Sequence, residues 1–404
     1  MSKHNSHLNS AVTILRSYKG DPPFHLYIKK YFAANKKYGS GDRKEITSLC
    51  YNYFRLGHTV SNAAPEEKIL LATFICEEKL GAFLAYFKPE WNDKMEAPLA
   101  EKLAFISTHF PAFKPEEIFP FKDELSDDID ELKFSLSFLI QPKLFLRIRP
   151  GHNKRVVGKI NGAGIRFQML AADCLALPNS SKINSILAPD KEAVIQDFNS
   201  QETARLLKQA SITSPRVNTL WDCCAGSGGK SIMAYDIVPG LQLTVSDKRN
   251  SVLVNLAERF KNAGIKNYRA FAADLTTLHP GLSQHRGENA NLQAVKFDYI
   301  IADVPCSGSG TWSRTPEQLF YFNKKSICKY ASQQKQILTN VISLIKPGGY
   351  LQYITCSVFK KENEEIIKFI VENFSLDLVK KEMFNGCEMQ ADTLFTALFK
   401  AKSN

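Results

Sequence analysis

The second half of the 404-residue chain alternates between short apolar segments and amphipathic ones, and this alternation limits its possible folds most. From about residue 217, the apolar segments predicted to be strands are VNTLWDCC, LQLTVSD, YRAFAADL, FDYIIADVP and GGYLQYITCS. Segments with helical periodicity stand between them, such as VLVNLAERFKNAG and KYASQQKQILTNVISLI. Short buried strands separated by amphipathic helices predict an α/β fold, a parallel sheet with helices on both faces. The polar segment 281–293 is expected to be a surface insertion.

A glycine-rich loop joins the first of these strands to its helix. It runs Cys224-Ala225-Gly226-Ser227-Gly228-Gly229-Lys230. Such a loop lets backbone N–H groups approach a ligand closely at a helix N-terminus. The phosphate-binding pattern GxxxxGK[ST] fails because Cys224 stands at the first glycine position, and GxGxxG fails because Ser231 stands at the third. A tight structural turn remains the alternative to a ligand site.

An aspartate closes each of three predicted strands: Asp247 in LQLTVSD, Asp274 in FAADL and Asp303 in YIIADVP. The carboxyl ends of parallel strands line one edge of a sheet, where open α/β sheets bind ligands. Asp247 follows the glycine-rich loop by about 20 residues, where a carboxylate accepts hydrogen bonds from the ribose of an adenosine ligand. Each aspartate alone is equally well explained as a helix cap, but together they predict a cofactor site.

Two of the nine cysteines are predicted to stand at the same edge. Cys306 lies in DVPCSGSGT and Cys356 in YITCS, each directly after a predicted buried strand. Free cysteines are usually buried small hydrophobes, which suits Cys50, Cys76 and Cys174. No CxxC is present and no histidine is near Cys306 or Cys356, so no metal site is expected. Functional thiols are therefore the better interpretation of this pair.

The charge pattern favours a nucleic-acid partner. The chain has 52 Lys and Arg against 41 Asp and Glu, and a net charge of +11 attracts polyanions, with surface solubility as the alternative. Residues 91–132 hold eleven acids and four bases, whereas 133–172 hold eight bases and no acid, which predicts a domain boundary at about 132. The uncompensated bases are Lys133, Lys143, Arg147, Arg149, Lys154, Arg155, Lys159 and Arg166. The predicted RNA-binding residues among them are Lys143, Arg147, Arg149, Lys154, Arg155 and Lys159.

Residues 1–132 place apolar residues at three- and four-residue spacing, as in HLYIKKYFAANKK, which predicts helices. Asp42 is expected to cap a helix that begins at Arg43. Residues 133–195 alternate more and carry a turn signal at 149–151, so short strands with one or two helices are predicted there. The phenylalanines of the basic segment are interpreted as core in preference to base-stacking residues: Phe134, Phe138, Phe145 and Phe167.

The sequence also bears on location. The start, MSKHNSHLNSAVTIL, has no apolar core of signal-peptide length, and no stretch reaches 18 apolar residues. Nine cysteines, an odd number, exclude a disulfide scaffold and predict a reducing compartment. We therefore expect a soluble, cytoplasmic protein with no membrane partner.

Three motifs resemble those of the RNA 5-methylcytosine methyltransferases of the RsmB-like (Sun-domain) family. WDCCAGSGGKS is similar to the family's cofactor loop, ADVPCSGSGT to its motif with the first cysteine, and KPGGYLQYITCSVFKKENE to its motif with the second. The segment 194–200, VIQDFNS, is similar to the family's pre-core segment, and the resemblance covers about 140–400. The loop departs at Gly226-Ser227, where the family commonly has Ala-Pro, and the helix after Asp247, DKRNSVLVNL, lacks the family's usual arginine just before the leucine.

The resemblance implies three domains. Residues 201–404 would form a class I (Rossmann-like) methyltransferase core that depends on S-adenosylmethionine, and 133–200 a small basic α+β RNA-binding module. Residues 1–132 resemble, more weakly, the NusB-like helical RNA-binding domain of the bacterial ribosomal RNA members, through SGDR at 40–43 and YNYFR at 51–55. A monomer is expected.

The resemblance also assigns roles to residues. Cys356 is implied to add to carbon 6 of cytosine, Cys306 to assist its later expulsion, and Asp303 to hydrogen-bond the cytosine ring. The cofactor is expected at residues 224–230 and at the three strand-end aspartates, Asp247, Asp274 and Asp303. The implied activity is methylation of carbon 5 of cytosine in RNA, first of all small-subunit (16S) ribosomal RNA.

Alternatives stay open at this point. A transfer RNA substrate is the second choice, and a catalytically silent RNA-binding or ribosome-assembly factor is the alternative of a different class. The two cysteines, the three aspartates and the glycine-rich loop favour an enzyme. Lys230 is predicted with equal weight to contact substrate or cofactor, or to be a capping or solvated lysine.

Overall fold

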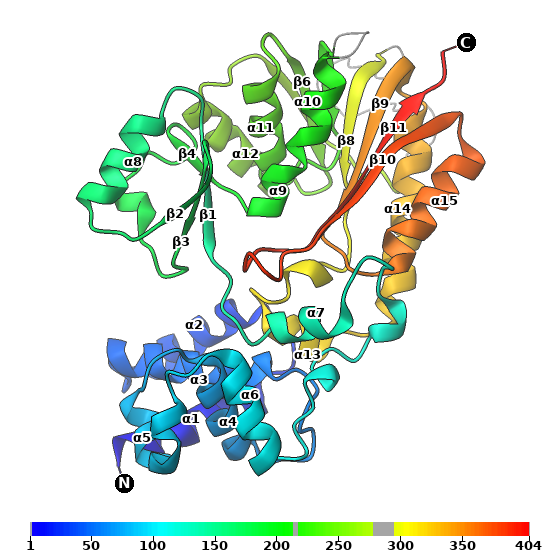
Figure 1. Cartoon of the computed structure of the whole chain (residues 1–404). Coiled ribbons are helices and arrows are strands. Elements are labelled where there is room, and N and C mark those ends of the chain that lie inside the picture. Colours follow the sequence, from blue (N-terminus) through cyan, green and yellow to red (C-terminus); the bar gives the residue numbers. More distant parts are fainter. Residues whose placement is uncertain (1, 213–216, 278–294, 404) are drawn as a thin grey trace. The chain divides into compact units, whose positions relative to one another are not determined.

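The structure, a computed structural model, describes residues 2–212, 217–277 and 295–403. Its chain divides into two units, and Thr311–Lys324, from the second half of the sequence, folds with the amino-terminal helices (Figure 1). The helical unit comprises Met1–Leu125, Ile129–Gln141 and Thr311–Lys324. The sheet unit comprises Ser126–Asp128, Pro142–Gly310 and Lys325–Asn404. This division differs from the three sequence segments, and the predicted insertion 281–293 lies outside the described residues.

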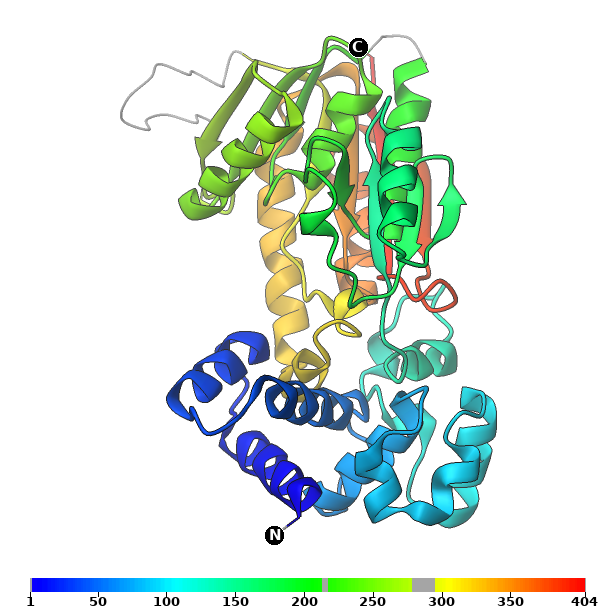
Figure 2. The ribbon, with the colours of Figure 1, turned by 90° about the vertical axis from the view of Figure 1, so that its left-hand side faces the viewer.

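The helices predicted for residues 1–132 are confirmed. Figure 2 shows only helices and loops in the blue and cyan part of the ribbon. The helices of the helical unit are α1 Lys3–Ser17, α2 Phe24–Ala34, α3 Ser40–Arg55, α4 Pro65–Cys76, α5 Ala82–Phe87, α6 Leu99–His109, α7 Glu131–Ser137 and α13 Pro316–Tyr321, with 3-10 turns η1 Pro89–Lys94, η2 Pro115–Glu117 and η3 Lys122–Glu124. The expected start of a helix at Arg43 is wrong. Helix α3 begins at Ser40, because Asp42 caps it from its third position by accepting the Gly39 N–H at 3.1 Å.

A small antiparallel sheet opens the sheet unit, with strand order β2-β3-β1-β4. Its elements are β1 Leu144–Ile148, α8 Asn153–Gly162, β2 Gln168–Ala171, β3 Cys174–Leu177, η4 Ile183–Ser185 and β4 Ala193–Ile195. Residues of β1 and α8, among them Leu146, Val156 and Ile160, share one core. The predicted short strands with a helix are confirmed.

The larger sheet has seven strands in the order β10-β11-β9-β8-β5-β6-β7. Its elements are α9 Phe198–Glu202, α10 Ala204–Ile212, β5 Thr219–Asp222, α11 Gly229–Ile237, β6 Gln242–Asp247, α12 Asn250–Ala263, β7 Tyr268–Ala272, β8 Phe297–Asp303, η6 Ser309–Thr311, α14 Lys325–Ile342, β9 Ile345–Thr355, η7 Lys360–Glu362, α15 Glu364–Asn373, β10 Leu376–Phe384 and β11 Leu394–Ala401. The predicted parallel pairing holds for β5 to β9. Strands β10 and β11 add an antiparallel edge.

Each face of the larger sheet has its own core. In β8, Tyr299 and Ile301 pack on one side with residues of α10, α11 and α12, while Ile300 and Ala302 pack on the other with residues of α14 and α15. Figure 1 shows these helices on the two faces. This alternation follows from the two-residue period of a strand, and the first six positions of β8 are all buried. No helix of the described ranges is long and apolar enough to cross a membrane.

Candidate active site

The glycine-rich loop follows β5 and carries two glycines with positive φ, Gly226 at 52° and Gly228 at 82°. Gly228 is the N-cap of α11 and lies in the left-handed region, and a Cβ there would lie 2.8 Å from the Phe260 ring. A Cβ on Gly226 would meet no atom within 4 Å, so the loop backbone is open at that point. The loop therefore offers a ligand close access to its backbone.

Asp247, the last residue of β6, holds this loop. Its Oδ2 accepts the Gly226 N–H at 3.1 Å, and its Oδ1 accepts the Arg249 N–H at 2.9 Å. The Ala225 N–H donates to the Ser246 carbonyl at 2.8 Å. The structure thus brings the predicted loop and the predicted aspartate together, as expected from the parallel pairing of β5 and β6.

Other loop residues have partners that the sequence did not suggest. Ser227 accepts two hydrogen bonds from Arg259 Nη1, to its carbonyl at 2.8 Å and to its Oγ at 2.9 Å. Arg259 also pairs with Asp190 at 2.7 Å. Cys224 packs partly against the core that contains Trp221. Arg259 of α12 therefore supports the loop, although the position just before the leucine of this helix lacks the family's usual arginine.

Asp274 lies two residues beyond the end of β7. The prediction that it closes this strand is therefore wrong. The Oδ2 of Asp274 pairs with Lys248 at 2.7 Å, and its Oδ1 accepts the Thr276 hydroxyl at 2.6 Å. Burial alone would raise the pKa of Asp274, but the bonds with Lys248 and Thr276 lower it below its usual range. The Ala273 N–H donates to the Asp247 carbonyl, so the two aspartates lie at neighbouring strand ends.

Lys230 and Asp303 form an ion pair, with 2.7 Å between Nζ and Oδ2. The Lys230 side chain is 13% exposed, which excludes the solvated lysine that the sequence left open. Burial alone would lower the pKa of Lys230, but the charge of Asp303, together with Cys356, raises it. Lys230 is therefore a stable cation beside Asp303 and Cys356.

Cys306 and Cys356 lie in contact, with 3.3 Å between their Sγ atoms. Strands β8 and β9 pair in parallel up to Asp303 and Ile354, so the loops that follow them leave the same edge of the sheet. The Gly310 N–H donates to the Cys356 carbonyl at 2.9 Å, and a Cβ at Gly310 would overlap the Thr393 carbonyl. The contact with Cys356 and burial raise the pKa of the Cys306 thiol well above its usual range.

Sequence reasoning missed Asp222 and Glu362. Asp222, at the end of β5, is fully buried, and its Oδ2 accepts the Ser231 hydroxyl at 2.6 Å. Burial raises the pKa of Asp222 to about 7. The one available signal was an acidic residue in an otherwise apolar strand, TLWD. Glu362 accepts hydrogen bonds from Ser307 and Ser357, which lie in the two loops that carry Cys306 and Cys356 (the cysteine loops). Among the described residues, no group of three or more His, Cys, Asp and Glu side chains could hold a metal ion.

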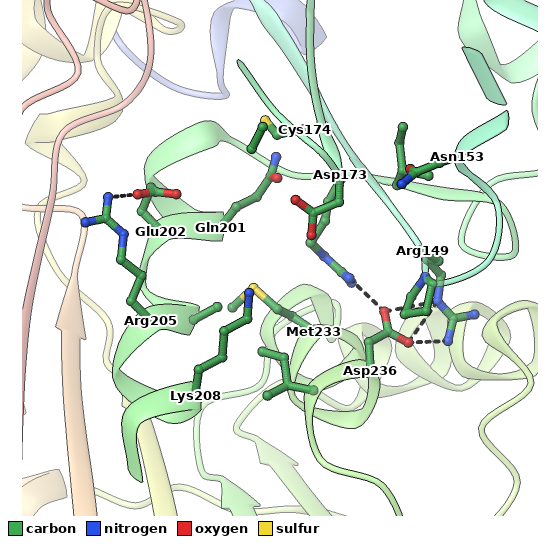
Figure 3. A pocket seen from close by; sticks show the side chains of 16 residues that line it. Arg149, Asn153, Asp173, Cys174, Gln201, Glu202, Arg205, Lys208, Met233 and Asp236 are labelled. Atoms are coloured by element: carbon green, nitrogen blue, oxygen red, sulfur yellow. Dashed lines mark hydrogen bonds and ion pairs between the residues drawn. The ribbon is translucent and has the colours of Figure 1, made fainter. Parts of the chain in front are cut away.

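Four bases of the segment 133–172 pair with acids outside it, so the prediction that they are uncompensated is wrong for these four. Arg147 and Arg149, in and after β1, both pair with Asp236 of α11, at 2.7 and 2.6 Å (Figure 3). Arg147 is 5% exposed. The three residues line a cavity of about 400 Å³ together with Asn153 and Lys208. The compensating acid lies 89 residues away in sequence, so the local charge count could not include it.

Glu192 compensates two more of these bases, Arg155 at 2.7 Å and Lys159 at 2.8 Å. Arg155 nevertheless remains 65% exposed. Lys154 is exposed, and Lys143 Nζ lies 3.5 Å from the Gln168 side-chain oxygen. The predicted RNA-binding residues thus fall into two structural arginines, the buried Arg147 and the partly buried Arg149, and a group near the surface.

Comparison with known proteins agrees with this geometry. Residues 210–399 match the family model described as 16S rRNA methyltransferase RsmB/F. A ribosomal RNA small subunit methyltransferase B of Xylella fastidiosa (strain 9a5c) is 29% identical over 270 residues, which are 65% of this chain and 59% of that protein. A probable ribosomal RNA small subunit methyltransferase B of Bacillus subtilis is 27% identical over 238 residues, 58% of this chain and 50% of that protein. The matches thus span little more than half of these relatives.

Two solved structures share the fold. PH0851 is similar over 99% of both chains, with a TM-score of 0.68 and 17% identity. A methyltransferase homolog protein from Pyrococcus horikoshii is similar over 67% of this chain and 90% of that one, with a TM-score of 0.53 and 18% identity. The sheet unit therefore has the predicted methyltransferase fold, and the amino-terminal unit is all-helical. Residues 210–399 are therefore similar to the RsmB/F methyltransferase family, and the sequence resemblance to the RsmB-like (Sun-domain) family agrees with this match.

Proposed function

We propose that the protein is an S-adenosylmethionine-dependent RNA (cytosine-5)-methyltransferase. The observation that carries this proposal is the contact of Cys306 with Cys356 beside the ion pair of Lys230 with Asp303. A pair of thiols next to a cation and a carboxylate suits addition to a pyrimidine ring followed by elimination. The names of the relatives support ribosomal RNA of the small subunit as the substrate.

The residues at the ends of β5 and β6 fit the cofactor. The open backbone at Gly226 and the carboxylate of Asp247 would hold it, with Asp274 at the neighbouring strand end. Asp247 Oδ1 accepts both the backbone N–H and the Nε–H of Arg249, whereas Oδ2 accepts only the Gly226 N–H among the described residues and has a second lone pair for a ribose hydroxyl. When bound, S-adenosylmethionine supplies a methyl group on a positively charged sulfur.

Cys356 is the proposed nucleophile. Its thiolate forms a bond to carbon 6 of cytosine, and the electron pair of the 5,6 double bond moves toward carbon 5, which becomes nucleophilic. After carbon 5 has taken the methyl group, it loses its proton to a base, the bond between Cys356 and carbon 6 breaks, and the double bond forms again. The ammonium of Lys230 interacts with Cys356. Its positive charge would stabilise the Cys356 thiolate before the addition and again after the elimination.

Asp303 and Cys306 have supporting roles in this proposal. Asp303 keeps its Oδ2 on Lys230, and 33% of its side chain is exposed, so it remains open to a hydrogen bond from the cytosine ring. Cys306 lies within 3.3 Å of the leaving sulfur and assists its expulsion. A target base must be unstacked to present its face to Cys356, which favours a single-stranded or flipped nucleotide.

The domain roles are part of the proposal. Residues 201–404 would carry catalysis, and the NusB-like residues 1–132 and the basic residues 133–200 would bind RNA. Within 133–200 the exposed Lys154 and Arg155 are the best placed to meet phosphates, because Arg147 and Arg149 are held by Asp236.

The test is methyl transfer by the purified full chain. The protein is incubated with labelled S-adenosylmethionine and, separately, with unmodified small-subunit ribosomal RNA and transfer RNA, and the nucleosides are identified by mass spectrometry. We expect 5-methylcytidine in the ribosomal RNA and none with Cys356→Ser. Labelled 5-methylcytidine in transfer RNA alone would move the substrate to that class. The absence of label from both RNAs would contradict the enzyme and favour an RNA-binding or assembly factor.

A further inference from the structure

Glu362, in the turn η7 after β9, bridges the two cysteine loops. Its Oε2 accepts the backbone N–H of Ser307 at 2.9 Å, and its Oε1 accepts the hydroxyl of Ser357 at 2.7 Å. Ser307 follows Cys306 directly, and Ser357 follows Cys356 directly. One carboxylate therefore holds the residue next to each sulfur.

The bridge is rigid because Glu362 is itself fixed. Its side chain is fully buried, and its Oε2 also accepts Gln334 Nε2 at 2.9 Å. Gln334 donates in addition to the Pro305 carbonyl at 3.1 Å, and the Tyr353 hydroxyl donates to the Glu362 carbonyl at 2.7 Å. Helix α14 and strand β9 thus lock the carboxylate between the loops, and the contact between the sulfur atoms depends on this clamp.

The two sulfur atoms have different charged neighbours: the carboxylate of Glu362 acts on Cys306, and the ammonium of Lys230 acts on Cys356. No Lys or Arg side chain of the described residues pairs with Glu362. Burial raises the pKa of Glu362 above its usual value, whereas the hydrogen bonds from Ser307, Ser357 and Gln334 favour its charged form, and in that form its negative charge lies beside Cys306. After the contact with Cys356 and burial, Glu362 is a further cause of the raised pKa of Cys306. The other titratable groups that face Cys306 are Tyr330 of α14 and Tyr353 of β9, both neutral at pH 7 because burial raises their pKa. Cys356, by contrast, interacts with the ammonium of Lys230.

We propose that Glu362 is a positioning residue for the cysteine pair: it clamps both loops and makes Cys306 the S–H donor to Cys356, the sulfur that carries negative charge. The assignment rests on the proposed function, because it separates the nucleophile from the group that assists its departure. In the elimination step the bond between Cys356 and carbon 6 breaks, and the S–H of Cys306 stabilises the departing thiolate by a hydrogen bond without giving up its proton. The proton of carbon 5 goes to a separate base.

Glu362→Gln tests the charge without removing the clamp. The amide oxygen can accept from Ser307 and Gln334, and the amide NH₂ can donate to the Ser357 hydroxyl, which is able to rotate. The readout is the pH dependence of alkylation of each cysteine by iodoacetamide, followed by peptide mass spectrometry on the full chain without RNA. In the wild type, Cys356 reacts at lower pH than Cys306. In Glu362→Gln, the alkylation rate of Cys306 at neutral pH rises at least threefold, and kcat falls at least tenfold with little change in KM.

Glu364→Gln is the matched control. Glu364 is a partly buried acid two residues away that accepts the Ser126 hydroxyl at 3.0 Å, and no hydrogen bond joins it to either cysteine loop. Its variant should leave both alkylation profiles unchanged. Equal Cys306 profiles in wild type and Glu362→Gln would overturn the proposal. Alkylation of Cys306 at lower pH than Cys356 in the wild type would also overturn the proposal. This second result does not depend on whether the variant folds. Alkylation needs no RNA, so it tests the role of Glu362 separately from methyl transfer. The expected alkylation profiles without any methyl transfer would contradict the proposed function and not the assignment of Glu362.

Discussion

Lys230 in the first turn of α11 and Asp303 at the end of β8 form a 2.7 Å ion pair, 73 residues apart in the sequence. The lysine side chain is more buried than the aspartate, at 13% against 33% exposed. Neither the sequence of the glycine-rich loop nor that of the strand ends indicates that these two residues pair with each other. The pair joins the proposed cofactor loop to the proposed substrate side of the site.

We expect Lys230→Met to lower kcat at least about 100-fold, because it leaves Asp303 without its cation and removes the positive charge beside Cys356. Methyl transfer to RNA at saturating substrate measures this effect. Lys346→Met is the control, since Lys346 pairs with Asp298 at 2.8 Å near the other end of β8. A similar loss in both variants would show that the effect is not local to the site.

The two cysteine variants are expected to fail in opposite ways. Cys356→Ser should abolish turnover and form no covalent RNA adduct, because the nucleophile is gone. Cys306→Ser should accumulate a protein–RNA adduct that survives a denaturing gel, because elimination is slowed after the bond to carbon 6 has formed. An adduct in Cys356→Ser and none in Cys306→Ser would reverse the assignment of the two sulfurs.

Removing the shared acid of the arginine pair should destabilise the sheet unit. Asp236→Ala leaves the buried Arg147 and the partly buried Arg149 without their carboxylate, which costs about 3–5 kcal/mol of the free energy of unfolding. Urea unfolding followed by circular dichroism measures this loss. Lys154→Ala, at an exposed position on α8, should change the free energy by less than about 0.5 kcal/mol. Equal stability of both variants would mean that the pairing contributes little.

Asp222 makes stability depend on pH. Its pKa is raised to about 7 by burial, so the native state holds a proton that the unfolded chain loses at about pH 4. The stabilisation is therefore complete at low pH and is lost as pH rises to about 7, by up to about 4 kcal/mol. Asp222→Asn should remove this part of the decline. Urea unfolding at about pH 5 and about pH 8 compares the two proteins, and parallel declines would contradict the assignment.

Arg55 is a structural residue of the helical unit. It is 3% exposed, and its Nη1 donates to the carbonyls of Phe138, Ile140 and Ser313, while its Nη2 donates to the Gln141 side chain. Arg55→Ala leaves three carbonyls without this donor and should cost about 3 kcal/mol or more. Hydrogen exchange should then become faster in Thr311–Lys324. Unchanged protection of that segment would show that other contacts hold it.

The parts that could be predicted from sequence are those governed by short repeats. The period of the strands placed Asp247, Asp303, Cys306 and Cys356 at one sheet edge, because parallel strands end together. Pairings between distant segments could not be predicted, since a local charge count contains no information about Asp236 when it reads Arg147. The same limit hid Glu362, whose partners come from three different elements.

The assignment of 311–324 to the helical unit has a consequence for how the chain is made. Arg55 and Ser313 are 258 residues apart, and Tyr321 places its ring 5.3 Å from that of Tyr18. A ribosome must therefore synthesise most of the sheet unit before the amino-terminal helices can complete their own core. Until then the aromatic surface around Tyr18 and Phe54 lacks its last partners, and the nascent chain must protect it from aggregation.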